Sequence, residues 1–124
     1  MEVKARRLVP GNVCGEAVVV DSLSFFGEVD PERGILRDGR SIDGKILVIG
    51  RVRGSTVGAY VIYGLRYYRR APKAILVKGE ADPIVVTGAV LARIPLYDRL
   101  GNGLPIRDGV KVCVKDDIDI VDRE

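Results

Sequence analysis

The residue best placed to do chemistry in this sequence is Ser55, because of the segments on either side of it. Ser55 belongs to a glycine-rich segment, 50–58, which follows an apolar run at 45–49 and precedes a run at 57–68 with helical spacing of apolar side chains. A strand, a glycine-rich turn and a helix N-terminus in succession favour an anion, because backbone N–H groups and the positive end of the helix dipole face it together. The segment therefore predicts an anion site that contains one serine hydroxyl.

The same serine has a purely structural interpretation. Ser and Thr are common N-caps, whose side-chain oxygen accepts a hydrogen bond from an N–H of the first helical turn. The segment has neither the Gly-Lys-Ser/Thr of a Walker loop nor the G-x-G-x-x-G spacing of a dinucleotide-binding turn. Taken alone, the segment leaves both interpretations of Ser55 open, the helix cap and the functional group.

Composition predicts one folded domain, residues 1–124, with a charged surface. The chain has 47% hydrophobic and 30% charged residues, which is enough for a core and a well-solvated exterior. Its formal charge of +3 permits an anionic substrate but does not indicate a nucleic-acid partner. The densest basic cluster, Arg66, Arg69 and Arg70, lies at the end of the predicted helix, where positive charge suits the dipole. The high charge and the scarcity of amide side chains are typical of thermophilic sources.

Two cysteines and no histidine limit the metal chemistry of this chain. Cys14 and Cys113 each lie among apolar residues, so we expect two buried free thiols. Two cysteines and no histidine cannot supply a three- or four-ligand zinc or iron–sulfur site, so any metal must come from a partner chain or from carboxylates. We expect no metal bound by this chain. No apolar stretch follows Met1 as in a signal peptide, and no run reaches transmembrane length. We therefore expect a cytoplasmic protein without a membrane partner.

Short apolar runs predict many strands and one main helix, 57–68. The predicted strands are 3–9, 13–20, 45–49, 74–77, 84–86, 89–94, 110–114 and 118–121. The nearly continuous apolar character of 13–20 predicts a central strand. Pro95 predicts an edge strand or a bend at 95–97, because proline cannot donate to a β-ladder. The whole pattern favours a mixed β/α domain of barrel-like or sandwich architecture.

A long connection at 22–34 contains both phenylalanines of the chain. Long ordered loops in compact domains are often functional. Two adjacent aromatic side chains cannot easily both point inward, so we expect one of Phe25 and Phe26 to plug the core edge and the other to line a cleft. Asp30 before a proline predicts a tight turn. We expect Gly27 and Asp30 to fix the shape of this loop where it faces the glycine-rich segment.

Three parts of the sequence together resemble one known family. They are Leu-Ser-Phe-Phe-Gly-Glu-Val-Asp-Pro at 23–31 with Gly34, Gly-Lys-Ile-Leu-Val-Ile at 44–49 with Arg-Gly-Ser-Thr at 53–56, and Ala-Pro-Lys-Ala-Ile at 71–75 with Gly-Ala-Val-Leu-Ala-Arg-Ile-Pro at 88–95. In this order and spacing they are similar to the small subunits of archaeal phosphomevalonate dehydratases, in the aconitase X family.

The resemblance implies a fold, a partner and a reaction. The fold would be the swivelling β/β/α barrel-like domain that is mobile in aconitases. The partner would be a large subunit that holds an iron–sulfur cluster. The reaction would be dehydration of mevalonate 5-phosphate to trans-anhydromevalonate 5-phosphate in the archaeal mevalonate pathway. Ser55 matches the family's proton acceptor, but ordinary aconitases have an arginine just after the equivalent serine pair, where this chain has Val57 and Gly58.

The residues around Ser55 suit this chemistry. Abstraction of a proton α to a carboxylate needs a base close to that carbon, and a serine needs help to act as one. A helix N-terminus, backbone N–H groups and a guanidinium would stabilise the alkoxide, while iron on the other chain would polarise the leaving hydroxyl. The residues expected to bind substrate come from this segment and from the long loop: Arg53, Gly54, Thr56, Gly27 and Asp30.

Two other functions fit the same residues. A related aconitase-like hydro-lyase would act on another hydroxy acid with the same serine. A non-catalytic anion-binding or assembly module would keep Ser55 for structure alone. An assay with each hydroxy acid distinguishes the first alternative from the dehydration of mevalonate 5-phosphate. Isolation of the chain from its source distinguishes the second alternative, because a cysteine-rich partner is expected only for the enzyme.

Overall fold

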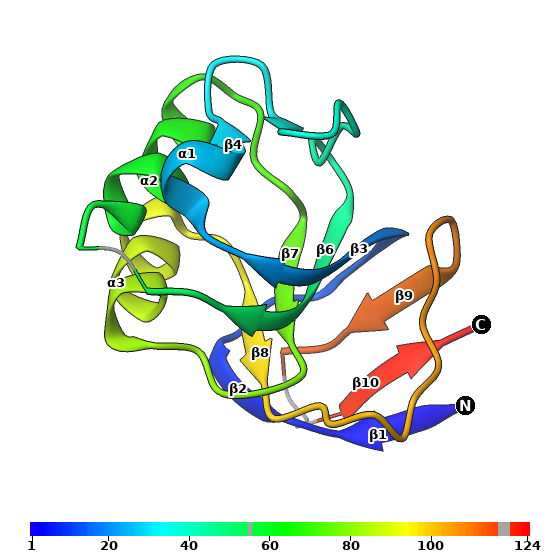
Figure 1. Cartoon of the computed structure of the whole chain (residues 1–124). Helices are drawn as coiled ribbons and strands as arrows, with labels where there is room; N and C mark the ends of the chain where they lie inside the picture. Colours follow the sequence, from blue (N-terminus) through cyan, green and yellow to red (C-terminus); the bar gives the residue numbers. More distant parts are fainter. Residues whose placement is uncertain (55, 117–119) are drawn as a thin grey trace.

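The computed structural model describes residues 1–54, 56–116 and 120–124, which form one large sheet with helices gathered on one side (Figure 1). In chain order the elements are β1 (Glu2–Lys4), β2 (Arg6–Val9), β3 (Val13–Leu23), α1 (Phe25–Glu28), β4 (Val29–Asp30), β5 (Ile35–Leu36), β6 (Ile46–Val52), α2 (Gly58–Tyr67), β7 (Ala74–Val77), α3 (Pro83–Ala92), β8 (Leu96–Asp98), β9 (Lys111–Val114) and β10 (Ile120–Arg123). Eight strands make a sheet in the order β1-β10-β9-β3-β6-β7-β8-β2, and β4 pairs with β5. The prediction of a mixed β/α, barrel-like fold is confirmed, while the single domain over 1–124 stays a prediction.

The two ends of the large sheet come together at Ala5, so that the sheet is nearly closed into a barrel. β1 pairs with β10 at one end of the strand order, and β2 pairs with β8 at the other. Only Ala5, which is buried, separates β1 from β2 in the sequence. The prediction of one continuous strand at 3–9 is therefore wrong, because the chain changes its pairing partner in the middle of this segment.

β3 links the antiparallel and parallel parts of the sheet. Its first residues, from Val13 to Glu16, run antiparallel to β9, and those from Ala17 to Leu23 run parallel to β6. β6 is parallel to β7, and β7 is parallel to β8. The central position predicted for 13–20 is confirmed, and the strand continues beyond it to Leu23.

The parallel strands carry apolar side chains on both faces. In β6, Ile46 and Val48 belong to one buried cluster, while Leu47 and Ile49 belong to another, because successive side chains of a strand point to opposite faces. The cluster around Leu47 includes Ile62 of α2 and residues of α3, so it lies between the sheet and the helices. The other cluster fills the inside of the barrel. Burial on both faces explains why this run is continuously apolar.

α3 replaces the two strands predicted at 84–86 and 89–94. Asp82 is its N-cap, whose side chain accepts a hydrogen bond from the Val85 N–H at 2.8 Å, and a proline occupies the first turn. Gly88 packs against α2, where an added Cβ would come within 3.0 Å of the α2 backbone. The strand predictions are wrong because capping and helix packing outweigh the β-branched composition of this segment.

Most of the other predicted elements are confirmed. The runs at 45–49 and 74–77 are β6 and β7, and 57–68 is α2. The closing strands are β9 and β10, although residues 117–119 lie outside the described part of the chain. The edge predicted at Pro95 is wrong, because β8 pairs on both sides. The Pro95 carbonyl accepts a hydrogen bond from the Ile75 N–H at 2.8 Å, so this residue contributes to the ladder through its acceptor.

The connection at 22–34 is more structured than predicted. β3 extends to Leu23, and α1 is a single turn with non-helical backbone angles inside it. Phe25 is 2% exposed and Phe26 is 61% exposed, which confirms that only one of them plugs the core. The carbonyl of Asp30 accepts a hydrogen bond from the Gly34 N–H at 2.8 Å, which confirms the tight turn.

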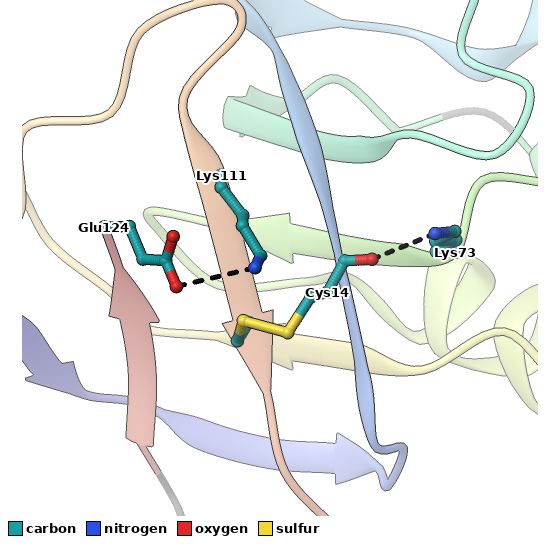
Figure 2. The surroundings of a disulfide bond; sticks show 5 residues. Cys14, Lys73, Lys111 and Glu124 are labelled. Carbon is teal, nitrogen blue, oxygen red and sulfur yellow. Dashed lines mark hydrogen bonds and ion pairs between the residues drawn. A yellow bond between two sulfur atoms is a disulfide. The ribbon is translucent and has the colours of Figure 1, made fainter.

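Cys14 and Cys113 form a disulfide, so the expectation of two buried free thiols is wrong (Figure 2). They are direct partners across β3 and β9, with Cα atoms 4.1 Å apart. Cys14 is exposed, because strand alternation turns its side chain outward although its neighbours are apolar. Figure 2 also shows Lys73, whose ammonium donates to the Cys14 carbonyl at 3.0 Å, and Lys111 beside Glu124.

Candidate functional site

The glycine-rich segment lies at the edge of the sheet where the parallel strands end. β3, β6 and β7 are parallel, so the segments that follow them leave the sheet at the same edge and lead into α1, α2 and α3 (Figure 1). Ligands of sheets with parallel strands commonly bind at this edge. Of the predicted site residues, Arg53, Gly54 and Thr56 are described here. Ser55 lies outside the described residues.

The turn itself is shorter than the sequence predicts. β6 continues through Val52, so Gly50 belongs to the strand, where an added Cβ would lie 2.4 Å from the Asp21 carbonyl oxygen of β3. The turn comprises residues 53–57, and α2 begins at Gly58 with Val57 as its N-cap. Both interpretations of Ser55, the helix cap and the functional group, stay predictions, because this residue lies outside the described part of the chain.

Arg53 anchors this turn to the end of β3. Its backbone N–H donates to the Leu23 carbonyl at 2.8 Å, and its Nε donates to the Ser22 hydroxyl at 2.9 Å. Its NH2 nitrogen forms a salt bridge and hydrogen bond with the Glu28 carboxylate, which also accepts a hydrogen bond from the Ser24 N–H at 2.8 Å. The turn after β6 is thus joined to the loop after β3 by one guanidinium.

These contacts change the ionisation of both partners. The hydrogen bond from Arg53, together with the one from the Ser24 amide, holds the pKa of Glu28 below its ordinary value. The hydrogen bond to Glu28 raises the pKa of Arg53. Both side chains are therefore charged at neutral pH. The Arg53 side chain remains 45% exposed, so its cation is accessible to an anion above the sheet edge.

Asp82 closes the other side of the turn. A Cβ added at Gly54 would lie 3.3 Å from the Asp82 carboxylate, which at the same time caps α3. The space enclosed between this carboxylate, Arg53 and Phe25 is only about 10 Å³, about the room one water needs. This cavity is therefore too small for an organic anion.

Gly27 and Asp30 line a different surface from Arg53. Both border an open groove of about 250 Å³ in which Glu28, Ile35 and Arg37 also take part. Gly27 has a φ of +88°, which favours glycine, and its carbonyl accepts a hydrogen bond from Arg37 at 3.2 Å. The structure thus separates the two loop residues from the turn, and Glu28 is the residue in contact with both.

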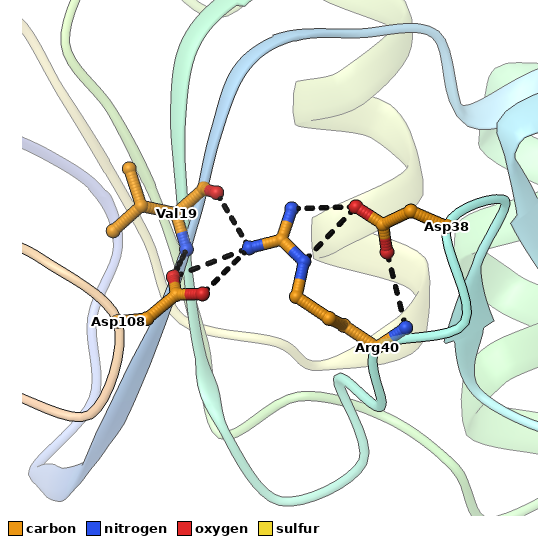
Figure 3. A network of polar contacts seen from close by, with 4 residues as sticks. All are labelled: Val19, Asp38, Arg40 and Asp108. Atoms are coloured by element: carbon orange, nitrogen blue, oxygen red, sulfur yellow. Dashed lines mark hydrogen bonds and ion pairs between the residues drawn. The ribbon is translucent and has the colours of Figure 1, made fainter.

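The loop at 37–40 borders a second groove of about 220 Å³, which reaches Ser22 and Glu28. Arg40 holds this loop in place by donating to the Val19 carbonyl at 2.9 Å and to the carboxylates of Asp38 and Asp108 (Figure 3). The hydrogen bonds that Asp38 accepts from the side chain and the backbone N–H of Arg40 lower the pKa of this carboxyl group. One arginine therefore ties the loop both to β3 and to the segment before β9.

Comparison with known proteins identifies the family. The family model described as the aconitase X swivel domain matches residues 2–122. The chain belongs to the aconitase X swivel-domain family. The phosphomevalonate dehydratase small subunit of Aeropyrum pernix is 50% identical over 123 residues, covering 94% of this chain and 89% of that protein. The corresponding small subunit of Thermococcus kodakarensis is 48% identical, with 94% and 92% covered.

A solved structure supports the same assignment. The crystal structure of Thermococcus kodakaraensis aconitase X in its holo-form superposes with a TM-score of 0.92 at 44% identity, over 100% of this chain and 98% of that one. The resemblance found in the sequence is therefore confirmed, including the archaeal relatives and the swivelling β/β/α barrel-like fold.

The described residues of this swivel domain do not fit an iron–sulfur cluster. They contain no group of three or more His, Cys, Asp or Glu side chains placed to hold a metal ion. The sequence has no histidine, and its two cysteines are joined to each other.

Among the described helices, none is long and apolar enough to cross a membrane.

Sequence reasoning missed three polar residues at this edge: Ser22, Glu28 and Asp82. Glu28 stands inside one of the segments that carry the family resemblance, directly after Gly27, and could have been singled out there. Asp82 precedes a proline, which is the start signal of a helix. Ser22 gives no such signal, because only the parallel pairing of β3 with β6 brings it to Arg53.

Proposed function

We propose that this chain is the small subunit of a two-subunit hydro-lyase that dehydrates mevalonate 5-phosphate to trans-anhydromevalonate 5-phosphate, in the cytoplasm of an archaeon. The observation that carries the proposal is the likeness to proteins named phosphomevalonate dehydratase small subunit, at 50% and 48% identity over nearly the whole length of both chains. The candidate site agrees with this function, because it offers the partly exposed Arg53 cation to an anionic substrate at the edge of the sheet.

In this proposal Ser55 takes the proton α to the substrate carboxylate. Its position in the sequence supports this role, since it follows Arg53 and Gly54 at the end of β6 and precedes α2. The Arg53 guanidinium, held by Ser22 and Glu28, would favour both the serine alkoxide and the substrate anion. Gly54 and Thr56 would approach the substrate through their backbone, while Gly27 and Asp30 would shape the neighbouring loop.

The proposal also includes a large subunit. The relatives are small subunits by name, and an iron–sulfur cluster in such an enzyme would belong to the other chain, because the residues described here do not fit one. The large subunit would cover the edge formed by the ends of β3 and β6. The whole contribution of the present chain is then to position the base, to bind the anion and to exclude water.

Co-expression with the large-subunit gene of the same organism tests the proposal. The purified complex is expected to convert mevalonate 5-phosphate to the anhydro product, and the isolated small chain is expected to be inactive and free of iron. A complex that turns over another hydroxy acid, such as an isopropylmalate-type substrate, but not mevalonate 5-phosphate would contradict the proposed substrate. Iron–sulfur absorbance from the small chain alone would contradict the proposal that the cluster belongs to the large subunit.

A further inference from the structure

We infer that Glu28 is a positioning residue: it holds Arg53, on which the turn after β6 begins, in place, and the proposed serine base depends on it. The inference rests on the proposed function for its effect on turnover, but the contacts that carry it are independent of that function. Glu28 is the carboxylate that joins the loop after β3 to the turn after β6.

The first step in the argument is that Glu28 is itself held in place. One of its oxygens, Oε1, accepts a hydrogen bond from the Ser24 N–H at 2.8 Å and one from Arg53. Its side chain is only 23% exposed, so water competes weakly for these donors. Because Ser24 directly follows β3, the carboxylate is fixed relative to the sheet and can act as a rigid anchor.

The second step is that Glu28 fixes the orientation of Arg53, the first residue of the turn. A guanidinium has five N–H donors in a planar fork, and here Ser22 accepts from Nε while Glu28 accepts from NH2. Two fixed nitrogens determine the plane and direction of the whole group. The backbone of Arg53 is held as well, by its hydrogen bond to the Leu23 carbonyl. Glu28 thus orients the residue on which the turn begins.

The third step concerns charge. Without Glu28, the Arg53 cation would keep only the neutral Ser22 hydroxyl as a side-chain partner among the contacts described here. It would then be free to turn toward Asp82, which lies on the other side of Gly54. A carboxylate at position 28 therefore selects one of two acidic partners for Arg53. Small displacements of a catalytic group cost large factors in rate, on the order of 10²-fold for about 1 Å.

Hydrogen exchange on the full 124-residue chain tests the anchor directly, without any activity. Nuclear magnetic resonance would follow the Ser24 and Arg53 amides in the wild type, in Glu28→Gln and in Glu16→Gln. The control is matched because Glu16 also forms an ion pair, with Lys45 at 3.1 Å, at the opposite end of β3. In Glu28→Gln we expect exchange at Arg53 to rise about tenfold, while amides in the middle of β6 stay unchanged. Equal exchange in the three proteins would overturn the inference.

Kinetics of the assembled enzyme test the consequence. Glu28→Gln is expected to lower kcat about tenfold or more, with little change in KM, whereas Glu16→Gln leaves both unchanged. In an Arg53→Met background, Glu28→Gln should change kcat less than about twofold, because Glu28 acts through Arg53. If Glu28→Gln again lowers kcat about tenfold in that background, the inference is overturned. An inactive wild-type complex would refute the proposed function instead, and the exchange measurement would still decide the role of Glu28.

Discussion

Asp98→Asn tests how the barrel is closed. Asp98 in β8 is completely buried and accepts two hydrogen bonds from Arg6 in β2, from Nε at 2.9 Å and from NH2 at 2.7 Å. It also accepts one from the Ala81 N–H at 2.9 Å. One carboxylate therefore joins the last two strands of the sheet to the segment that leads into α3. Asparagine keeps the size of this side chain but loses its charge and one acceptor oxygen.

The magnitude follows from burial and from the number of contacts. Removing one partner of a buried ion pair typically costs about 3–5 kcal/mol. The Arg6 side chain is 40% exposed, so water can solvate it once its partner is lost, and we expect a smaller loss of about 2–3 kcal/mol in the free energy of unfolding.

The loss should also depend on pH. Burial opposes the charged form of Asp98, but the hydrogen bonds from Arg6 and the Ala81 amide outweigh it and hold its pKa below the ordinary value. A carboxylate whose folded pKa is lowered stabilises the protein above its unfolded pKa, and this contribution is lost as the pH falls through the folded pKa. The difference between wild type and variant should therefore be constant above about pH 5 and shrink below about pH 4.

Guanidinium chloride unfolding, followed by circular dichroism, measures both effects. Asp122→Asn is a suitable control, because Asp122 is half exposed and its ion pair with the N-terminus at 3.6 Å should contribute less than about 1 kcal/mol. A loss for Asp98→Asn no larger than that of the control would refute the reasoning about closure. A loss that does not change between neutral and acidic pH would refute the reasoning about the ion pair.

Two further predictions concern stability. Replacing Cys14 and Cys113 together by serine, or reducing the wild type, should lower the free energy of unfolding by about 2–5 kcal/mol, because the bond links residues 99 positions apart; equal unfolding midpoints with and without reductant would contradict this. Gly88→Ala should cost about 1–3 kcal/mol, because the new methyl group would lie 3.0 Å from the Ala59 Cα, whereas Gly103→Ala meets nothing within 4 Å and should stay within about 0.5 kcal/mol. Equal denaturation midpoints for the two glycine variants would show that α2 and α3 do not pack closely there.

The parallel strands at the centre of the fold were predictable, because a strand that is buried on both faces is a continuously apolar run in the sequence. The runs at 45–49 and 74–77 are continuously apolar, and they are β6 and β7. α2 was predictable for a different reason, since apolar side chains recur at helical spacing through 57–68. The face predicted to be buried was less accurate, because Leu65 is buried whereas Tyr60 and Tyr68 are exposed. These signals are local, and they depend on no contact with a distant part of the chain.

The helix α3 was not predicted, because apolar residues on both of its sides obscure the helical periodicity of its sequence. Val90 and Leu91 are exposed, although they are as apolar as the buried Val85 and Ala89. The helix is therefore apolar on both sides, and the β-branched residues suggested strands instead. Only the start signal at Asp82 could have indicated a helix.

Long-range partners account for the remaining misses. The disulfide depends on the register between β3 and β9, which the sequence does not contain. The contacts of Arg53 with Ser22 and Glu28 span 31 and 25 residues and arise from the parallel pairing of β3 with β6. The position of the glycine-rich turn at the end of a strand was thus predictable, whereas the side chains that hold the turn were not.

The turnover of Ser55→Ala in the assembled two-subunit enzyme is the most direct test of the central claim. Ser41→Ala serves as the matched control, because it removes a hydroxyl from an exposed position outside the turn. If Ser55 is the base, kcat for mevalonate 5-phosphate should fall by a factor of about 10²–10⁴, while substrate affinity persists and the control keeps full activity. A Ser55→Ala enzyme that retains more than about a tenth of wild-type turnover would contradict the assignment.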